Sequence, residues 1–349
     1  MHICRGAPYI LFFLMLIWVV PVRSLAYDAA ANGPLATVEL DFPDLRDAAR
    51  EGRRVPIKVH VPQGDGPYPV IIISHGAGGN RDTHFAQARH LASHGYVVLA
   101  VEHTASNTAR LKRGFRKAKN LREMARDPKA ILGRPKDVGF AIDRAEAWQA
   151  SHPRLGGRLD LGRIGVLGHS YGAYTSLTVA GARPALDWLE PAVPPGRGLG
   201  PDLHDPRVRC AVALSPQGPG EPFFHEDSYA SLRIPVMGIS GTRDRELAGN
   251  RPAKQRLEAF RLWPTQRGRN RFVWIDGARH VDFGDATGSG QRMLPSRTRK
   301  AVQPVVRAAT LLYFDGLLKE DLAAWAQLSA AGLQPYLRDP VKWVKVFRR

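Results

Sequence analysis

Cysteine is almost missing from this chain, whose 349 residues include only Cys4 and Cys210. A disulfide framework is therefore excluded as the main support of the fold, and the hydrophobic core must hold it together. Cys210 lies in an apolar run, residues 208–214, which predicts a buried free thiol within a strand. Hydrophobic residues make up 44 % of the sequence, enough for a sizeable core in one large α/β domain or two smaller ones.

Near its start the chain also lacks an apolar run long enough to cross a membrane, which takes about 20 residues. The run from Tyr9 to Val20 has 12 residues; Arg5 precedes it and Ser24-Leu25-Ala26 follows it. A basic start, a short apolar stretch and a small-x-small exit are typical of a secretory signal peptide. We expect residues 1–26 to be such a signal and the protein to be exported, periplasmic or secreted. An uncleaved anchor is the alternative, because Arg23 is unusual so close to a cleavage site.

Acidic residues are few, 32 against 50 Lys and Arg, so the net charge is +18, and about +16 once residues 1–26 are removed. Such a balance indicates a solvated basic surface, with weak attraction to anionic polymers or membranes as the alternative. Nothing resembles a nucleic-acid module, so we expect no nucleic-acid partner. We also expect no metal, since no His-Glu-x-x-His or Cys/His cluster occurs, and no cofactor. The segment 76–81 resembles a dinucleotide fingerprint but has Arg81 in place of the third glycine.

Short apolar runs alternate with helical patterns along most of the chain. Strands are expected at residues 38–42, 54–61, 70–73, 96–101, 163–167, 208–214, 235–240 and 271–275, and helices at 85–93, 135–149, 173–180, 252–262 and 298–318. The basic segment 104–133 is expected to be irregular, and 183–207, rich in proline and glycine, to be a long loop or small lid. This order predicts an α/β fold, with a mostly parallel, doubly wound sheet of about eight strands and helices on both faces. We expect one domain over residues 27–349, with the tail after residue 318 packed on its body.

The strongest motif is Gly168-His169-Ser170-Tyr171-Gly172, which follows the apolar run 163–167 and precedes a helical pattern. A strand, a sharp turn with serine at its apex and a helix together form the nucleophile elbow. Strand and helix pass so close there that side chains at Gly168 and Gly172 would collide. The amino end of the helix also offers N–H groups to a developing anion. We therefore expect Ser170 to be a nucleophile.

A serine hydroxyl needs a base to take its proton, and the base needs an acid to fix its tautomer. In this kind of sheet the chain order is serine, acid, histidine, each after the carboxyl end of a strand. Asp244, after the strand 235–240, is the expected acid, and His280, after the strand 271–275, is the expected base. Glu246 and Asp276 are rivals for the role of the acid.

Two other histidines, His75 and His103, lie at strand ends but precede the serine in the chain. We interpret His75 as structural or site-lining rather than as the base. An oxyanion needs two N–H donors. One is expected from Tyr171, directly after the serine, and the other from Ala77, in the glycine-rich loop after the strand 70–73.

Four stretches carry a resemblance to a known family: residues 54–59; 74–79 with 91–98 and 101–103; 134–138; and 205–208 through 213–216. They resemble the exported bacterial α/β-hydrolases known as predicted dienelactone hydrolases, which are related to platelet-activating factor acetylhydrolases. The resemblance implies acyl-ester hydrolysis without a cofactor and supports Ala77 as an oxyanion donor. Two departures matter. Dienelactone hydrolases proper use a cysteine nucleophile where this chain has Ser170. The acetylhydrolases carry their acid after the strand that here ends at Ser215, which offers no carboxylate.

The sequence therefore predicts a serine hydrolase that cleaves small or lipid-like carboxylic esters through an acyl-enzyme. A serine peptidase of the same fold is one alternative, although no large gating domain is visible. A binding protein that kept the fold without catalysis is the other. The segments 104–133 and 183–207 are expected to shape the choice of substrate.

Overall fold

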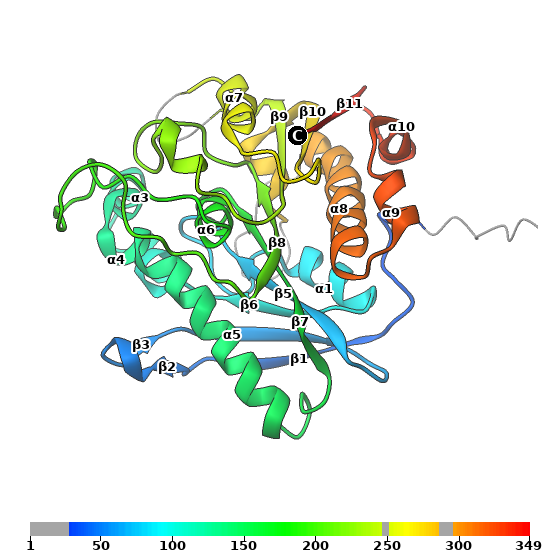
Figure 1. Ribbon diagram of the computed structural model, residues 1–349, viewed down its shortest axis with the longest axis horizontal. Helices are drawn as coiled ribbons and strands as arrows, with labels where there is room; N and C mark the ends of the chain where they lie inside the picture. Colours follow the sequence, from blue (N-terminus) through cyan, green and yellow to red (C-terminus); the bar gives the residue numbers. More distant parts are fainter. Residues whose placement is uncertain (1–27, 246–250, 286–295) are drawn as a thin grey trace, which may run out of the picture.

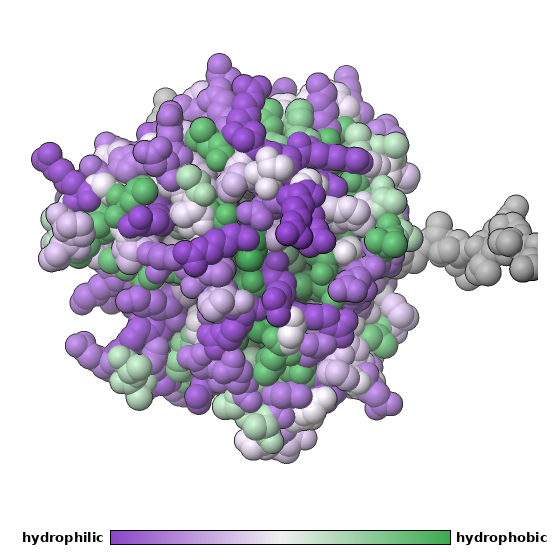
Figure 2. Space-filling view, viewed as in Figure 1, coloured by the Kyte–Doolittle hydropathy of each residue, from purple (hydrophilic) through white to green (hydrophobic). Residues whose placement is uncertain are grey.

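The structure is a computed structural model that describes residues 28–245, 251–285 and 296–349. The predicted signal peptide, residues 1–26, and the rival acid Glu246 lie outside these residues. Within the described ranges, no helix combines the length and the apolar character that crossing a membrane requires. The face shown in Figure 2 is mostly hydrophilic, with smaller hydrophobic areas between the hydrophilic residues.

One large sheet organises the described chain, with strands in the order β1-β4-β6-β5-β7-β8-β9-β10-β11 (Figure 1). The bounds are β1 Thr37–Phe42, β4 Ile57–Pro62, β5 Tyr68–Ser74, β6 Val97–Val101, β7 Leu159–His169, β8 Val208–Leu214, β9 Val236–Arg243, β10 Arg271–Arg279 and β11 Val344–Arg348. From β6 to β10 every neighbouring pair is parallel, whereas β1, β4 and β11 pair antiparallel at the two edges. The predicted mostly parallel sheet is confirmed, with nine strands instead of about eight. Outside it, β2 (Arg46–Asp47) and β3 (Arg53–Arg54) form a short ribbon.

Helices cover both faces of the sheet (Figure 1). On one face lie α1 (Phe85–Ser93) and α8 (Arg297–Leu318); on the other lie α5 (Gly133–Ser151), α6 (Tyr171–Val179) and α7 (Lys254–Leu262). The central strand β5 shows how the sequence produces this: Ile71 and Ile73 pack with α1 and α8, while Val70 and Ile72 pack with α5. Successive side chains of a strand point to opposite faces, so a strand buried on both sides must be apolar throughout.

The segment 104–133 was predicted to be irregular, and this prediction is wrong. It contains η2 (Thr104–Ser106), α2 (Thr108–Leu111), α3 (Lys117–Arg126) and α4 (Pro128–Ile131). The side chain of Asp127 accepts from the Lys129 N–H (2.8 Å), and Pro128 occupies the first turn of α4. That is a strong helix-start signal. Helix α3 has no clear hydrophobic periodicity in its sequence, because only Met124 and Ala125 are buried and many of its other residues are charged.

Two further segments, residues 183–207 and the C-terminal tail, complete the described chain. Residues 183–207 form a loop with neither helix nor strand, apart from an isolated bridge between Ala185 and Leu199. The tail packs on the body through α9 (Leu322–Gln327), α10 (Ala330–Leu333), η5 (Gln334–Tyr336) and β11. Strand β11, which pairs with β10 at the sheet edge, was not predicted.

Candidate active site

The turn between β7 and α6 has the strained geometry that its sequence predicts. Ser170 has φ 55° and ψ −116°, a left-handed φ that residues other than glycine rarely adopt. A Cβ placed on Gly168 would lie 2.1 Å from the backbone oxygen of Gly172, and one on Gly172 would lie 1.9 Å from that of Ser74. Only glycine fits at either position, which is why strand, turn and helix can approach so closely. The turn presents Ser170, a partly exposed residue, at the carboxyl edge of the sheet.

Three side chains that are distant in the sequence meet at this edge. Nε2 of His280 lies 2.8 Å from Oγ of Ser170, and its Nδ1 lies 2.9 Å from Oδ1 of Asp244. His280 begins η4 (His280–Phe283), directly after β10, and Asp244 directly follows β9. The structure therefore brings all three predicted residues into one chain of hydrogen bonds. The side chain of Asp244 is fully buried, whereas that of His280 is 12 % exposed, so this series of hydrogen bonds leads from the core toward solvent.

The carboxylate of Asp244 is held ionised by its surroundings. Burial acts to raise its pKa, but the charge of Arg256 and hydrogen bonds from His280 and Ser215 outweigh burial and hold the pKa at about 2. Nε of Arg256 lies 3.3 Å from Oδ2, and Oγ of Ser240 donates to that same oxygen at 2.7 Å. Oγ of Ser215 donates to Oδ1 at 2.9 Å. An ionised carboxylate with three such neighbours is a fixed acceptor for the imidazole.

The tautomer of His280 follows from this carboxylate. An ionised carboxylate can only accept, so Nδ1 must carry the proton and Nε2 is left to accept from the hydroxyl of Ser170. Oγ of Ser215 and Nη2 of Arg256 also approach Nδ1, at 2.8 and 3.4 Å. Because Nδ1 is already protonated, the Arg256 approach is a close contact between two donors and not a hydrogen bond. In the neutral form of the ring, this arrangement leaves the unprotonated Nε2 facing the serine hydroxyl.

Neighbouring residues hold the backbone of Ser170 and His280 in place. Nε2 of His169 donates to the carbonyl of His280 at 3.0 Å, and the two rings lie 5.0 Å apart. The amide of Gln217 donates to the carbonyl of Ser170 at 2.7 Å. Burial lowers the pKa of His169 well below its ordinary value, so this ring stays neutral. Both contacts restrict the relative movement of nucleophile and base.

The loop that carries Ala77 lies against the serine. A Cβ on Gly76 would come within 3.5 Å of Cβ of Ser170, so the backbone of this loop passes beside the nucleophile. Gly78 anchors the far end of the loop, with its N–H donating to the carbonyl of Ser106 at 2.8 Å and its carbonyl accepting from Thr108 at 2.8 Å. On the opposite side, Tyr171 is the first residue of α6, and the first four N–H groups of a helix have no partner within it. Gly76 thus lies beside Ser170 and Tyr171 directly follows it in α6, while the role of Ala77 and Tyr171 as oxyanion donors stays a prediction.

The remaining sequence candidates lie elsewhere. Asp276 is part of β10, and the carboxylate that contacts His280 is that of Asp244. His75 and His103 are buried, and His75 uses both ring nitrogens on neighbouring backbone groups. No group of three or more His, Cys, Asp or Glu side chains is placed to hold a metal ion in the part of the chain that the structure describes.

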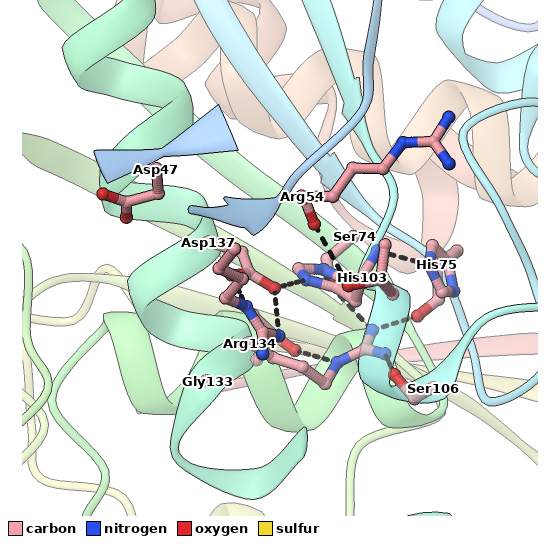
Figure 3. A network of polar contacts seen from close by, with 12 residues as sticks. Asp47, Arg54, Ser74, His75, His103, Ser106, Gly133, Arg134 and Asp137 are labelled. Carbon is pink, nitrogen blue, oxygen red and sulfur yellow. Dashed lines mark hydrogen bonds and ion pairs between the residues drawn. The ribbon is translucent and has the colours of Figure 1, made fainter. Parts of the chain in front are cut away.

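The structure also contains a second Ser-His-Asp arrangement that sequence reasoning missed (Figure 3). His103 contacts Oδ2 of Asp137 through Nδ1 and Oγ of Ser74 through Nε2, each at 2.9 Å. All three side chains are fully buried, and Oγ of Ser74 also accepts from Arg134 at 3.1 Å. A serine enclosed in this way cannot reach a substrate, so the network is structural. Ion pairs from Arg50 and Arg53 to Asp137 connect it to the N-terminal part of the domain.

Sequence reasoning also missed Arg256, Ser240 and Gln217, which hold the acid and the serine. Arg256 lies in α7 in a helical pattern, where an arginine normally marks an exposed face. Gln217 follows β8 by three residues, at the carboxyl edge where site residues gather, and this position was the one signal that could have revealed it.

Comparison with known proteins gives two kinds of match. The family model described as platelet-activating factor acetylhydrolase, isoform II, matches residues 53–132, a range that includes Ala77 but ends before Ser170. A platelet-activating factor acetylhydrolase of Cavia porcellus is 26 % identical over 267 residues, covering 67 % of this chain and 53 % of that protein. One of Bos taurus is 30 % identical over 208 residues, covering 50 % of this chain and 40 % of the relative. The chain thus spans about half the length, or less, of these curated relatives.

Proposed function

We propose that this protein is a serine hydrolase acting on carboxylic esters, because its sheet is consistent with an α/β-hydrolase fold and its sequence is similar to platelet-activating factor acetylhydrolases. The observation that carries the proposal is the continuous hydrogen-bonded chain from Ser170 through His280 to Asp244. It begins at a partly exposed serine in a strained turn and ends at a buried, ionised acid, which is the arrangement that activates a hydroxyl.

In the proposed mechanism, Ser170 attacks the acyl carbon of the ester while Nε2 of His280 takes its proton. Asp244 accepts from Nδ1 and stabilises the imidazolium that forms. The N–H groups of Ala77 and Tyr171 hold the oxyanion, aided by the positive end of α6. His280 then gives the proton to the leaving alcohol. Water, deprotonated by the same imidazole, hydrolyses the acyl-enzyme and restores the serine.

The substrate we propose is a small or lipid-like ester. The relatives bear the name platelet-activating factor acetylhydrolase, which describes removal of an acetyl group from a lipid. Since the chain aligns with about half of those proteins, or less, their particular substrate supports only the ester class here. We further propose that the domain acts after export, with residues 1–26 removed as a signal peptide. Amino-terminal sequencing of the protein from the extracytoplasmic fraction tests this, and a start at Met1 would refute it.

A panel of nitrophenyl esters of increasing acyl length, assayed with the wild type and Ser170→Ala, tests the function. We expect ester cleavage by the wild type, a loss of at least 10³-fold in kcat/KM for the variant, and labelling of Ser170 by a fluorophosphonate. Cleavage of peptide amides without esters would favour a peptidase. Absence of both cleavage and labelling in a folded protein would leave only a binding role and refute the proposal.

A further inference from the structure

Arg134, near the start of α5, is a fully buried cation whose hydrogen bonds all go to neutral oxygens (Figure 3). Its acceptors are Oγ of Ser106 (2.6 Å), Oγ1 of Thr175 (2.9 Å), Oγ of Ser74 (3.1 Å) and the backbone carbonyl of His75. Burial lowers the pKa of Arg134 to about 10, so the group stays charged at neutral pH. Among the described residues it takes part in no ion pair, and the nearby carboxylate of Asp137 already contacts His103 and Arg53. Burying a cation without a counter-ion is unfavourable, so the segments that its hydrogen bonds hold in place must be explained.

On one side, Arg134 holds the loop that leads to Ala77. The guanidinium donates to the carbonyl of His75, two residues before Ala77. Nδ1 of His75 in turn donates to the carbonyl of Gly76 at 2.7 Å, and its Nε2 accepts from the N–H of His103 at 3.0 Å. Both backbone carbonyls that precede Ala77 are therefore hydrogen-bonded. The Gly76 carbonyl and the Ala77 N–H belong to one planar peptide unit, so the hydrogen bond to that carbonyl also fixes the direction of the N–H.

On the other side, the same guanidinium holds the first turn of α6. Its Cζ lies 4.4 Å from the centroid of the Tyr171 ring, a cation–π distance. Its Nε donates to Oγ1 of Thr175, and the Thr175 hydroxyl donates to the carbonyl of Tyr171 at 3.1 Å. One planar group thus connects the β5 loop to the helix that begins directly after the nucleophile.

We propose that Arg134 is a positioning residue that sets the separation of the two oxyanion donors, the N–H groups of Ala77 and Tyr171. This inference rests on the proposed function, because it assigns a task to a site that performs acyl transfer. The rigid fork of a guanidinium suits the task, since it can bond several acceptors in one plane at once, whereas a lysine ammonium cannot. Donors that are already in place when the oxyanion forms stabilise the transition state more strongly than they stabilise the bound ester.

The test compares Arg134→Lys and Arg134→Met with Arg144→Met, a matched control on the same helix. Arg144 also lies over an aromatic ring, that of Phe140 at 5.5 Å, but has no contact with the loop or with α6 among the described interactions. We expect both Arg134 variants to lose about 10- to 100-fold in kcat on a soluble nitrophenyl ester, with KM changed less than about threefold. An aryl boronic acid, which forms a tetrahedral adduct on the serine, should bind weaker by the same factor. The control should keep wild-type values.

The pH profile separates positioning from damage to the base. Arg134 does not touch His280, so the plateau of kcat/KM should fall while its acid limb stays at the wild-type pH. If both Arg134 variants fail to fold, Thr175→Val and Ser106→Ala each remove one acceptor from the cation and should each lower kcat about two- to tenfold at constant KM. Folded Arg134 variants with wild-type kcat, or folded acceptor variants without any loss, overturn the inference and leave the proposed function standing. A wild type that cleaves no ester and takes no fluorophosphonate overturns the proposed function first.

Discussion

Replacing Asp244 by asparagine tests the electrostatics of the site most directly. The two carboxylate oxygens face different partners: Oδ1 faces Nδ1 of His280 and Oδ2 faces Nε of Arg256, at 2.9 and 3.3 Å. Arg256 can only donate, and it is fixed by hydrogen bonds to the carbonyls of Ser215 and Pro216. An asparagine will therefore turn its oxygen toward Arg256 and its NH₂ toward His280. That orientation moves the imidazole proton to Nε2, where it faces Ser170 and blocks proton transfer.

The expected loss is about 10³- to 10⁴-fold in kcat/KM, equivalent to about 4–5.5 kcal/mol of transition-state stabilisation. Nitrophenyl acetate hydrolysis at pH 8 measures it, with circular dichroism and thermal unfolding as checks on the fold. An Asp244→Asn enzyme that keeps more than a tenth of wild-type kcat/KM would show that this carboxylate does not orient the base.

Ser215 offers a rescue of that variant. Its Oγ lies 2.8 Å from Nδ1 of His280, at the end of the strand next to that of Asp244. A carboxylate at position 215 can therefore reach the same proton. We expect Ser215→Asp in the Asp244→Asn background to recover at least tenfold in kcat/KM, while Ser215→Asn, equal in size but neutral, recovers nothing. Equal activity of the two double variants would mean that charge at this position has no influence on the imidazole.

Three further predictions concern buried residues of the fold. Gly172→Ala places a Cβ 1.9 Å from the backbone oxygen of Ser74, so we expect a loss of at least about 3 kcal/mol in unfolding free energy, read from urea titration; a loss under 1 kcal/mol would contradict the close approach. Burial raises the pKa of the Cys210 thiol, which should resist iodoacetamide until denaturant is added. Burial lowers the pKa of His84 to about 4 and of His90 to about 3, so the unfolded chain binds more protons below pH 6.5. As the pH is lowered from 6 to 4.5, these two groups should decrease the free energy of unfolding by up to about 2.7 kcal/mol per pH unit. A free energy of unfolding that does not change over this range would refute the prediction.

Most of the central fold could be predicted because its signals are local. The apolar run of β5, the helix at residues 85–93 and the strand at 208–214 depend on periodicity and on turn residues beside them. The helices within 104–133 could not be predicted in the same way, because α3 buries only Met124 and Ala125 and its other residues indicate a solvated surface. Strand β11 was not predicted because an edge strand forms by pairing with its partner, here β10, which lies about 70 residues earlier in the chain. That pairing is not visible in the local sequence pattern.

The elbow and the order of serine, acid and histidine could be predicted from the chain alone, since an apolar strand, Gly168-x-Ser170-x-Gly172 and a helical pattern follow one another without a gap. The three-dimensional packing settled which carboxylate contacts His280. It holds Asp244 among Ser215, Ser240 and Arg256 and leaves Asp276 within β10. It also decided that one Ser-His-Asp arrangement opens to solvent while that of Ser74, His103 and Asp137 is closed beneath Arg134. Hydrogen bonds and burial depend on distances across the sheet, and residue spacing along the chain does not encode those distances.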